Sequence, residues 1–487
     1  MQSRTAKADT RELTYVLTEE RGTPSFNPLY SDTLLNLVFM EQLTATLVKY
    51  AFDGKSENCL AAAWRTSENG LRYSFTLRDG MRADDGTPIT AKAYYESLLR
   101  LFSLYIKANK DIPVFEQLQG FPDFRSGATS VISGMSADGN NLNFHFTANP
   151  DGILEFLSMP YYGFYSKKDF KEDGSWKDDH KITASGPWRL ASLDKKSVRL
   201  EKRKDWPYKD PGSPDSVNVM MLPFQEAIKL SPSRTIINKR IEGPKDVPAG
   251  YKRFLGTPTD LVAVVLSPYR KGPFKSKPLR QSFRNAILDV MSVEKISSEI
   301  SRNTFSFYPG QKQPAAPAKP AAGDFKPWAK HRLSVITSNA MTPAQLAYIK
   351  NILTKTAADK GMSVDFKGED RSKAGWKERL DALEDMDIRV VRVDTGGSYE
   401  PWVVRMMFCS RLGVGFPDPS GGIAVLTKNM TDRSPETASE FERIVSGDSA
   451  VIPIFNSAFS WLVSGDIGMD QFSPTANLIR FEKVQLR

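Results

Sequence analysis

Cysteine and histidine are scarce in this chain of 487 residues, which contains two cysteines and three histidines. Cys59 and Cys409 are far apart and have no zinc-binding or C-x-x-C spacing, so the usual ligands for metal and dithiol chemistry are lacking. The sequence does not decide whether the two cysteines form one long-range disulfide or are two unpaired buried thiols. His145, His180 and His331 are each solitary in sequence, which leaves a histidine-based triad poorly supplied. We expect no metal and no cofactor.

Long apolar runs are also missing. No stretch approaches the ~20 apolar residues that a membrane-spanning helix needs, and the best short run, Leu261 to Leu266, suits a buried strand. The first ten residues carry charge but are not followed by an apolar core of ~7–15 residues, so they are no secretory signal. Either the protein is cytosolic, or it is exported and its signal has been removed.

Charge of one sign is not concentrated, although 66 basic and 57 acidic residues give a net charge of +9. Basic residues alternate with acidic ones, as between Arg199 and Asp205, whereas nucleic-acid-binding proteins more often gather them on one face. The sequence therefore predicts no nucleic-acid partner. With 40% hydrophobic and 25% charged residues the composition is that of a soluble globular chain, long enough for about three units of ~150 residues.

The first half of the chain is expected to mix strands and helices. A strand is predicted at residues 12–16, a helix from Leu34 to Tyr50, a hairpin within Ala61–Leu77 that turns at Glu68–Gly70, a helix capped by Thr90, and a strand pair at Gly186–Leu190 and Val198–Leu200.

The second half has an α/β pattern. The predicted order is a buried strand at Leu261–Leu266, a helix beginning at Pro278, an extended Pro-rich connection at Gln313–Pro327, a strand at Leu333–Thr337, a helix from Thr342 to about Lys360, a strand at Met362–Phe366, an amphipathic stretch at Lys373–Leu383, and strands at Asp387–Val393, Val451–Phe455 and Phe459–Val463. Right-handed crossovers should make parts of this sheet parallel.

The most specific motif runs from Ala63 to Ala91. It describes two strands bounded by Gly70, Gly80 and Gly86, with aromatic residues on one face and a capped helix at its end. Its twelve matching positions resemble the signature of the family 5 extracellular solute-binding proteins, the oligopeptide- and dipeptide-binding proteins of ABC importers: Trp64, Gly70, Tyr73, Phe75, Leu77, Arg78, Gly80, Asp85, Gly86, Pro88, Thr90 and Ala91.

Three further segments, Ser185–Leu190, Gly272–Ala286 and Val451–Phe455, resemble elements of the same family in the same order. The resemblance implies an α/β, type II periplasmic-binding-protein fold of cluster C, with two lobes joined by hinge strands. The implied divisions are lobe I at 1–44, 181–262 and 457–487, an extra small domain at 45–180, and lobe II at 263–456. The ligand is expected in the cleft between the lobes, and Trp64 and Arg78 are expected to be structural.

In peptide-binding members of the family, an Asp in a loop after a strand accepts the α-ammonium group of the ligand. The preferred alignment places Glu400–Pro401 on the end of that motif, because the strand Asp387–Val393 precedes it, and the alternative uses Phe416–Pro419. Both alignments put a glycine, Gly397 or Gly415, where the family has the Asp. A buried ammonium group without a paired carboxylate is strongly destabilised.

Three explanations therefore stay open. Asp394 takes the place of the missing Asp, or the ligand lacks a free α-amine, or Asp394 and Glu400 are only loop caps. Aromatic walls from Tyr399 and Trp402, and a carboxylate contact from an arginine, would complete a site. The candidate ligand-binding residues are Asp394, Ser398, Tyr399, Glu400, Trp402 and Arg405, with Arg411 as an alternative arginine.

The sequence thus predicts a monomeric solute-binding receptor of an ABC importer that binds peptides or peptide-like solutes by hinge closure and docks on a membrane permease. Its location would be periplasmic or extracellular, with a lipoprotein anchor as one option. The alternative is a small-molecule sensor built on the same fold. An enzyme is not expected, because the chain has no P-loop, H-E-x-x-H or G-x-S-x-G motif and the adjacent pair Asp84–Asp85 lies in a turn.

Overall fold

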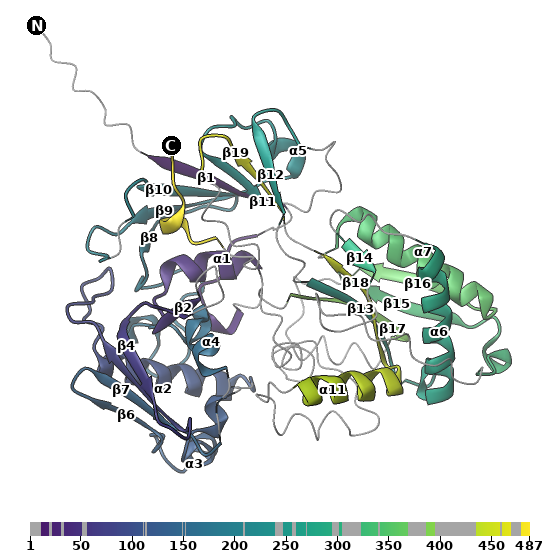
Figure 1. Cartoon of the computed structure of the whole chain (residues 1–487), viewed down its shortest axis with the longest axis horizontal. Helices are drawn as coiled ribbons and strands as arrows, with labels where there is room; N and C mark the ends of the chain where they lie inside the picture. Colours follow the sequence, from purple (N-terminus) through teal and green to yellow (C-terminus); the bar gives the residue numbers. More distant parts are fainter. Residues whose placement is uncertain are drawn as a thin grey trace, which may run out of the picture. The chain divides into compact units, whose positions relative to one another are not determined.

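The structure is a computed structural model of the chain (Figure 1). It describes residues 11–18, 22–30, 34–50, 56–110, 112, 114–148, 150, 152–207, 210–238, 247–255, 260–268, 270–294, 301–303, 323–338, 341–368, 386–394, 435–457, 460–468 and 479–487. The chain divides into two compact units, of which unit 1 comprises 1–239, 247–254 and 460–487, and unit 2 comprises 240–246 and 255–459. The finer lobe and extra-domain boundaries given above stay predictions.

Unit 1 is built on a seven-stranded mixed sheet. In spatial order its strands are β12 (Tyr251–Leu255), β19 (Ser460–Ser464), β11 (Thr235–Asn238), β1 (Glu12–Leu17), β10 (Ser216–Met221), β9 (Ser197–Lys202) and β8 (Trp188–Leu193). The central strand β1 runs parallel to both β10 and β11. Leu13, Tyr15 and Val16 are buried, as expected for a strand covered on both faces.

The helix predicted from Leu34 to Tyr50 is wrong in its second half. Helix α1 (Leu34–Leu43) ends at Leu43, and Val48–Tyr50 forms strand β2, which pairs with β3 (Ser56–Asn58). The reason lies in the β-branched residues Thr44, Thr46 and Val48, which lose side-chain freedom in a helix and favour a strand. The Thr44 hydroxyl donates to the Met40 carbonyl at 2.5 Å, satisfying an acceptor at the end of the helix.

The motif at Ala63–Ala91 forms the hairpin that the sequence predicts. Strands β4 (Ala61–Thr66) and β5 (Arg72–Leu77) pair antiparallel in a second sheet of order β4-β5-β7-β6. Trp64 stacks on Phe75 with ring centroids 6.4 Å apart, and Arg78 Nε donates to the Cys59 carbonyl at 3.1 Å. These contacts are internal to the fold, as expected. The other strands and the helices of unit 1 are β6 (Met135–Asp138), β7 (Asn141–His145), α2 (Ala91–Lys107), α3 (Phe121–Ser126), α4 (Ile153–Ser158) and α5 (Phe224–Ala227).

The N-cap predicted for α2 is confirmed. Thr90 is extended, and its hydroxyl accepts the Ala93 backbone N–H at 3.1 Å. Tyr94, Leu98 and Leu101 then lie on the buried side of the helix. A polar cap followed by an apolar stripe of helical period is enough to specify this element.

The segment around Ser185 and Gly186 needs glycine for a steric reason. Gly186 donates its backbone N–H to Leu43 at 2.9 Å, and a Cβ at this position would lie 2.5 Å from the Gln42 carbonyl oxygen. Ser185 Oγ accepts the Ala45 N–H and donates to the Phe164 carbonyl. This family-like element therefore fastens the chain to the end of α1 and contributes to the fold.

Unit 2 is a six-stranded mixed sheet with helices. The order of its strands is β14 (Ser301–Asn303), β18 (Val451–Ser457), β13 (Asp260–Leu266), β17 (Ile388–Asp394), β15 (Arg332–Thr337) and β16 (Ser363–Gly368). Strand β15 is parallel to β16 and β17, so the prediction of a partly parallel sheet is confirmed. The predicted amphipathic stretch at 373–383 and most of the Pro-rich connection lie outside the described residues.

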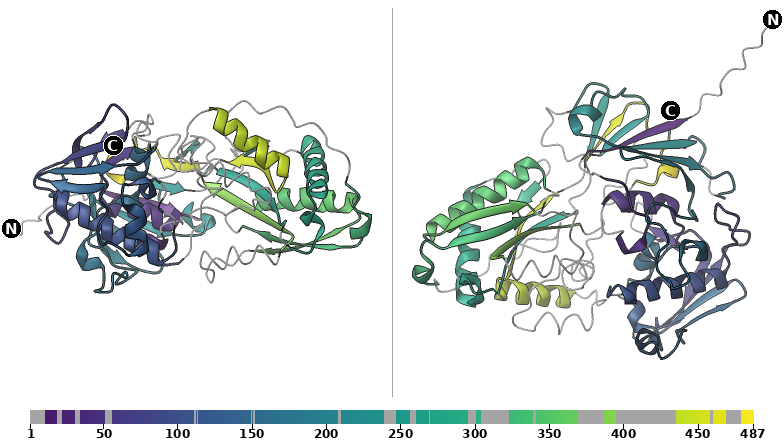
Figure 2. Two further views of the ribbon diagram at one scale, coloured as in Figure 1. Left: turned by 90° about the horizontal axis from the view of Figure 1, so that it is seen from below. Right: turned by 180° about the vertical axis from the view of Figure 1, so that it is seen from behind.

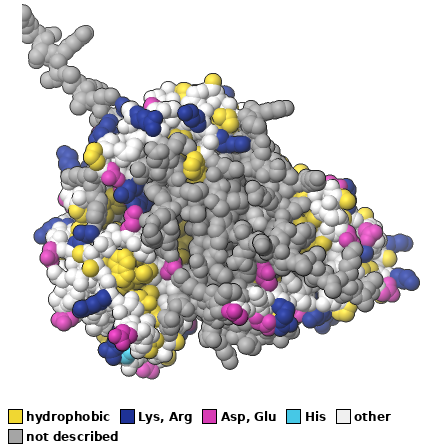
Figure 3. All heavy atoms as spheres, in the orientation of Figure 1, with side chains coloured by type: hydrophobic (Ala, Val, Ile, Leu, Met, Phe, Trp, Pro, Cys, Tyr) yellow, Lys and Arg dark blue, Asp and Glu magenta, His cyan; other side chains and the backbone are white. Residues whose placement is uncertain are grey.

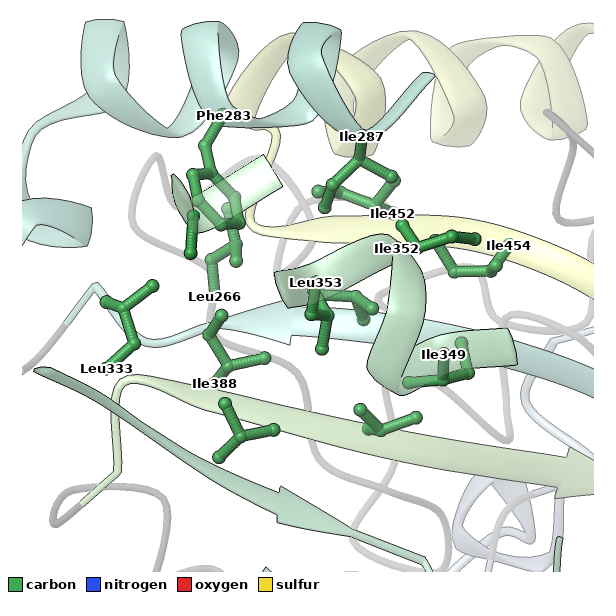
Figure 4. Close-up of a cluster of buried hydrophobic side chains, with 14 of the residues drawn as sticks. Leu266, Phe283, Ile287, Leu333, Ile349, Ile352, Leu353, Ile388, Ile452 and Ile454 are labelled. Atoms are coloured by element: carbon green, nitrogen blue, oxygen red, sulfur yellow. The ribbon is translucent and has the colours of Figure 1, made fainter. Parts of the chain in front are cut away.

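Helices α6 (Lys277–Val293) and α7 (Pro343–Asp359) pack side by side against this sheet (Figures 1 and 2), and α11 (Pro435–Asp448) contacts α6 and β18. Both predicted helix starts are confirmed, with Pro278 in the first turn of α6 and Thr342 in a capping box with Gln345 at the start of α7. Between helices and sheet lies one apolar core, which includes Phe283, Ile287, Ile349, Ile352, Leu353, Leu266, Leu333, Ile388, Ile452 and Ile454 (Figure 4).

A strap at residues 166–186 packs against α2 in unit 1, where Arg100 lies over the Phe170 ring and Lys107 donates to the Asp173 carbonyl. Asp169 in this strap is 8% exposed, and its Oδ1 accepts the backbone N–H and the hydroxyl of Thr183, both at 2.9 Å. Its Oδ2 has no hydrogen-bonding partner among the described residues. Burial raises the pKa of the Asp169 carboxyl to about 6, against the opposing effect of the Thr183 hydrogen bonds.

This geometry predicts acid stabilisation of unit 1. Because the folded pKa lies above the ordinary value of 3.8, Asp169 contributes stability that is fully present below pH ~4 and is lost as the pH rises through about 6. Asp169→Asn should remove this pH dependence and raise the free energy of unfolding at pH 7.5 by on the order of 1–3 kcal/mol. Denaturant unfolding at pH 5 and 7.5 measures both effects.

The control is Asp138→Asn, which changes an exposed aspartate of the same unit and should leave the pH dependence as in the wild type. An Asp169→Asn variant that loses stability between pH 5 and 7.5 as steeply as the wild type would contradict the assignment.

Candidate functional site

One edge of the unit 2 sheet gathers the carboxyl ends of four strands. Strands β15, β16, β17 and β18 end there, while the antiparallel strands β13 and β14 begin there. The register places Asp394, the last residue of β17, opposite Asp260, the first residue of β13, and pairs Asp260 also with Ser457 of β18. In open α/β sheets, ligands bind outside this edge. We therefore treat it as the unit 2 half of a candidate ligand site.

Two polar residues at this edge form hydrogen bonds with backbone carbonyls of neighbouring strands. Ser338, directly after β15, donates its N–H to the Val390 carbonyl at 3.2 Å, and Thr337 Oγ1 donates to the Lys367 carbonyl at 3.3 Å. Asn456 and Ser457 at the end of β18 are both buried. The edge thus combines neutral polar residues with acidic residues at Asp260 and Asp394 and basic residues at Lys367 and Arg302.

Of the residues predicted from sequence to bind the ligand, the structure places one. Asp394 ends strand β17, one residue beyond the predicted strand end, and leads directly into the candidate loop. Ser398, Tyr399, Glu400, Trp402 and Arg405 lie outside the described residues, as do the alternative Arg411 and the alternative motif Phe416–Pro419. Their roles stay predictions.

Unit 1 has a comparable polar edge at the carboxyl ends of its parallel strands. Thr18 follows β1, and its hydroxyl donates to the carbonyl of Asn238 at the end of β11, at 3.0 Å. Asn238 Nδ2 donates to the Tyr15 hydroxyl at 3.0 Å. Trp461 of β19 is the register partner of Asn238 and lies 5.8 Å from the Phe254 ring. Four segments far apart in sequence therefore meet at this edge.

The described polar residues of the unit 1 edge are neutral. Burial raises the pKa of Tyr15 to about 12, with the Asn238 hydrogen bond acting in the opposite direction. The phenol therefore stays uncharged at ordinary pH, and Thr18, Asn238 and Trp461 carry no charge. All four side chains are buried, so their hydrogen bonds join the strands at this edge.

Sequence reasoning missed the unit 1 edge and Asp260. A usable signal was present, since Thr18 follows one apolar strand, Asn238 ends another and Asp260 precedes a third. Such a position marks a residue at a sheet edge. What the sequence does not reveal is the pairing of β1 with β11 and of β11 with β19, which brings these residues together.

The chain changes unit at four positions, between residues 239 and 240, 246 and 247, 254 and 255, and 459 and 460. Three of these positions lie within two residues, in sequence, of a strand terminus: β11 ends at Asn238, β12 ends at Leu255 and β19 begins at Ser460.

Two other kinds of feature, a metal site and a membrane-spanning helix, are absent from the described residues. Within the described ranges, no group of three or more His, Cys, Asp or Glu side chains is arranged to hold a metal ion. No described helix is both long enough and apolar enough to cross a membrane. Cys59 is buried, burial raises the pKa of its thiol, and Cys409 lies outside the described residues, so the predicted alternatives for their pairing stay open.

Comparison with known proteins identifies the family. A model of the bacterial extracellular solute-binding proteins, family 5 (middle region), matches residues 55–401. The chain therefore belongs to this family, and the resemblance drawn from its motifs is confirmed.

Individual relatives are distant. Over 185 residues the chain is 24% identical to the nickel-binding periplasmic protein of Escherichia coli K12, covering 37% of this chain and 33% of the relative. Over 221 residues it is 22% identical to the dipeptide-binding protein DppE of Bacillus subtilis 168, covering 45% of this chain and 40% of the relative. The matches thus span well under half the length of these curated relatives.

Solved structures extend the likeness of fold to the whole chain. The structure of Haemophilus influenzae OppA in complex with RPPGFSPFR matches 98% of this chain and 99% of its own, with a TM-score of 0.74 and 14% sequence identity. The predicted fold class, an α/β periplasmic-binding-protein fold of the family 5 type, is confirmed. The relatives and neighbours are binding proteins.

The unit 1 edge gives a prediction about coupling. Asn238→Leu should lower the free energy of unfolding by about 1–3 kcal/mol, because the buried Tyr15 hydroxyl loses one of its hydrogen bonds. In a Tyr15→Phe background, Asn238→Leu should lower the free energy of unfolding by ~0.5–2 kcal/mol less than it does in the wild type. A double-mutant cycle from denaturant titrations measures the difference, and equal costs in both backgrounds would show that the hydrogen bond carries no coupling.

Proposed function

We propose that the protein is the solute-binding receptor of an ABC import system and binds peptides or peptide-like solutes between its two units. The observation that carries the proposal is the family match over residues 55–401, together with a whole-chain likeness to a protein solved with a bound peptide. The proposed location is periplasmic or extracellular, and the proposed partner of the loaded monomer is a membrane permease. No chemical change of the solute is part of the proposal.

The proposed mechanism is closure of the two units around the solute. The chain changes unit at four positions, and closure would need a hinge there. A ligand that contacts one edge in the open state and both in the closed state shifts the population by the free energy of its added contacts. A peptide, with its regular donors and acceptors, suits edges rich in neutral hydrogen-bonding groups.

Asp394 is the proposed acceptor for the α-ammonium group of a peptide. Its position supports this role, because it is the last residue of β17, at the carboxyl edge of the unit 2 sheet. In this role Asp394 would take the place of the Asp that the family motif has where this chain has Gly397 or Gly415. Ser398, Tyr399, Glu400, Trp402 and Arg405 are proposed to complete the site in the loop that follows.

Peptide affinity tests the proposal directly. The wild type should bind di- to pentapeptides of mixed sequence in titration calorimetry, and its radius of gyration should fall on binding. Asp394→Asn should weaken binding of free-amine peptides by about 30-fold or more, because one partner of a charged hydrogen bond is lost. N-acetylated peptides should bind both proteins equally.

The matched control is Asp359→Asn on α7, an exposed aspartate of the same unit, which should leave affinity unchanged. Equal loss of affinity for free and acetylated peptides would contradict the role of Asp394 and leave the receptor intact. Absence of binding to all peptides, with one discrete small molecule retained in native mass spectra, would contradict the peptide assignment and favour the sensor.

A further inference from the structure

The edge of the unit 2 sheet opposite the candidate ligand site is basic. It is formed by the loop after β13, the segment before β15, and the turns that precede β16, β17 and β18. We call it the amino edge and define it as residues 267–268, 270–277, 323–332, 359–363, 386–387 and 447–450. It carries eight basic and four acidic residues. Its basic residues are Arg270, Lys271, Lys275, Lys277, Lys326, Lys330, Arg332 and Lys360.

Hydrogen bonds and ring contacts hold these segments together at one end of the sheet. Arg270 Nη1 donates to Ser334 Oγ at 2.5 Å, joining the segment after β13 to β15. Phe325 lies 6.3 Å from Phe283 of α6, and the Lys330 N–H donates to the Gly361 carbonyl at 2.7 Å. The segments that carry the lysines therefore lie side by side at this edge.

Two of the four acidic residues are turned into the protein. Asp387 is 1% exposed, and its Oδ2 accepts from the N–H and hydroxyl of Ser334 at 2.9 and 3.0 Å and lies 3.4 Å from Arg270. Asp448 is 5% exposed and lies 3.3 Å from Lys277. These two carboxylates offset the charges of Arg270 and Lys277, two of the eight basic residues of the amino edge.

The solvent-facing part is dominated by lysine. Lys271, Lys275, Lys326 and Lys330 are exposed, and none of them has a carboxylate partner within ion-pair distance among the described residues. The two exposed acids, Asp324 and Asp359, are engaged locally, by the Lys326 N–H at 2.9 Å and by Lys360 at 2.7 Å. On the face of the molecule in Figure 3, basic and acidic side chains are interspersed among the described residues.

We propose that this amino edge binds the surface of an anionic phospholipid bilayer. Lysine is depleted from the cores of protein–protein interfaces, which favour Arg, Tyr, Trp and Met, so four unpaired lysines fit a protein partner poorly. A bilayer surface needs no matched geometry, because its charge is spread and point-like ammonium groups suffice. Each basic residue near an anionic surface strengthens binding by roughly fivefold.

On this proposal, the amino edge of the unit 2 sheet contacts lipid and the opposite, carboxyl edge contacts the solute. Strands β15, β16, β17 and β18 all run from the basic amino edge toward Asp394 and Ser457. Lipid contact at the amino edge would leave the carboxyl edge pointing away from the bilayer. Vesicle binding does not depend on the proposed receptor function, so the two can fail separately.

The test is co-sedimentation of the full chain with vesicles of phosphatidylglycerol and phosphatidylcholine in equal parts, at 50 mM and 300 mM salt. The wild type should sediment with these vesicles at low salt, far less at high salt, and not with phosphatidylcholine alone. The quadruple variant Lys271→Gln, Lys275→Gln, Lys326→Gln, Lys330→Gln should bind at least about tenfold more weakly.

A second quadruple variant with the same net charge is the control. Lys92→Gln, Lys195→Gln, Lys196→Gln and Lys204→Gln change exposed lysines of unit 1 and should alter vesicle binding less than about twofold. All eight side chains are exposed, so melting temperatures of both variants should match the wild type. Equal weakening in the two variants would overturn the proposal, as would absence of binding at 50 mM salt. Tighter capture of an acidic polypeptide than of vesicles would also overturn it, in favour of a protein partner.

Discussion

The register of strand β13 is the constraint on which the arrangement of unit 2 depends. Leu261, Val262, Ala263, Val264, Val265 and Leu266 are buried on both faces of the sheet between β17 and β18. A slip of one residue would exchange the side chains that face α6 and α7 with those of the other face, which close packing does not tolerate. The same register places Asp260 opposite Asp394 at one end and Leu266 opposite Ile388, next to Asp387, at the other. Burial of one short apolar strand thus fixes both the candidate ligand edge and the basic edge.

The sequence predicts local features of the fold better than features that depend on contacts between distant residues. The sequence predicts helix α2 with its cap, because Thr90 acts on a residue three positions away, and it predicts the start of helix α7 at Thr342, where the structure shows a capping box with Gln345. The helix from Leu34 was extended too far, since apolar content favoured a helix while the β-branched residues after Leu43 favour a strand. Local preference decides such elements only where pairing with another strand does not compete, and here β2 pairs with β3.

Of the residues at the candidate edges, the sequence predicts only the one whose chemistry a peptide ligand requires. Asp394 was singled out because an ammonium ligand needs a carboxylate, and the structure places its backbone at a sheet edge beside a second acidic residue. Asn238, Tyr15 and Trp461 gave no comparable signal, because their meeting depends on the pairing of strands separated by more than two hundred residues. Family resemblance supplies fold and class of function. It does not supply these contacts, since the family elements at Gly186 and Arg280 bind the backbone of neighbouring segments.

The difference in charge between the two candidate edges bears on how a receptor of this kind would engage its solute. Charged residues act over about a Debye length, roughly 8 Å in physiological salt, so in the proposed receptor unit 2 would determine the first encounter. The neutral groups of unit 1 act only at hydrogen-bond distance, and the raised pKa of Tyr15 keeps its phenol neutral. In the proposed receptor, the unit 1 edge would therefore contribute only on closure. In the proposed receptor, unit 2 would set the chemical class of solute that is captured, whereas unit 1 would set how long a captured solute is held, because contacts made only in the closed state slow release.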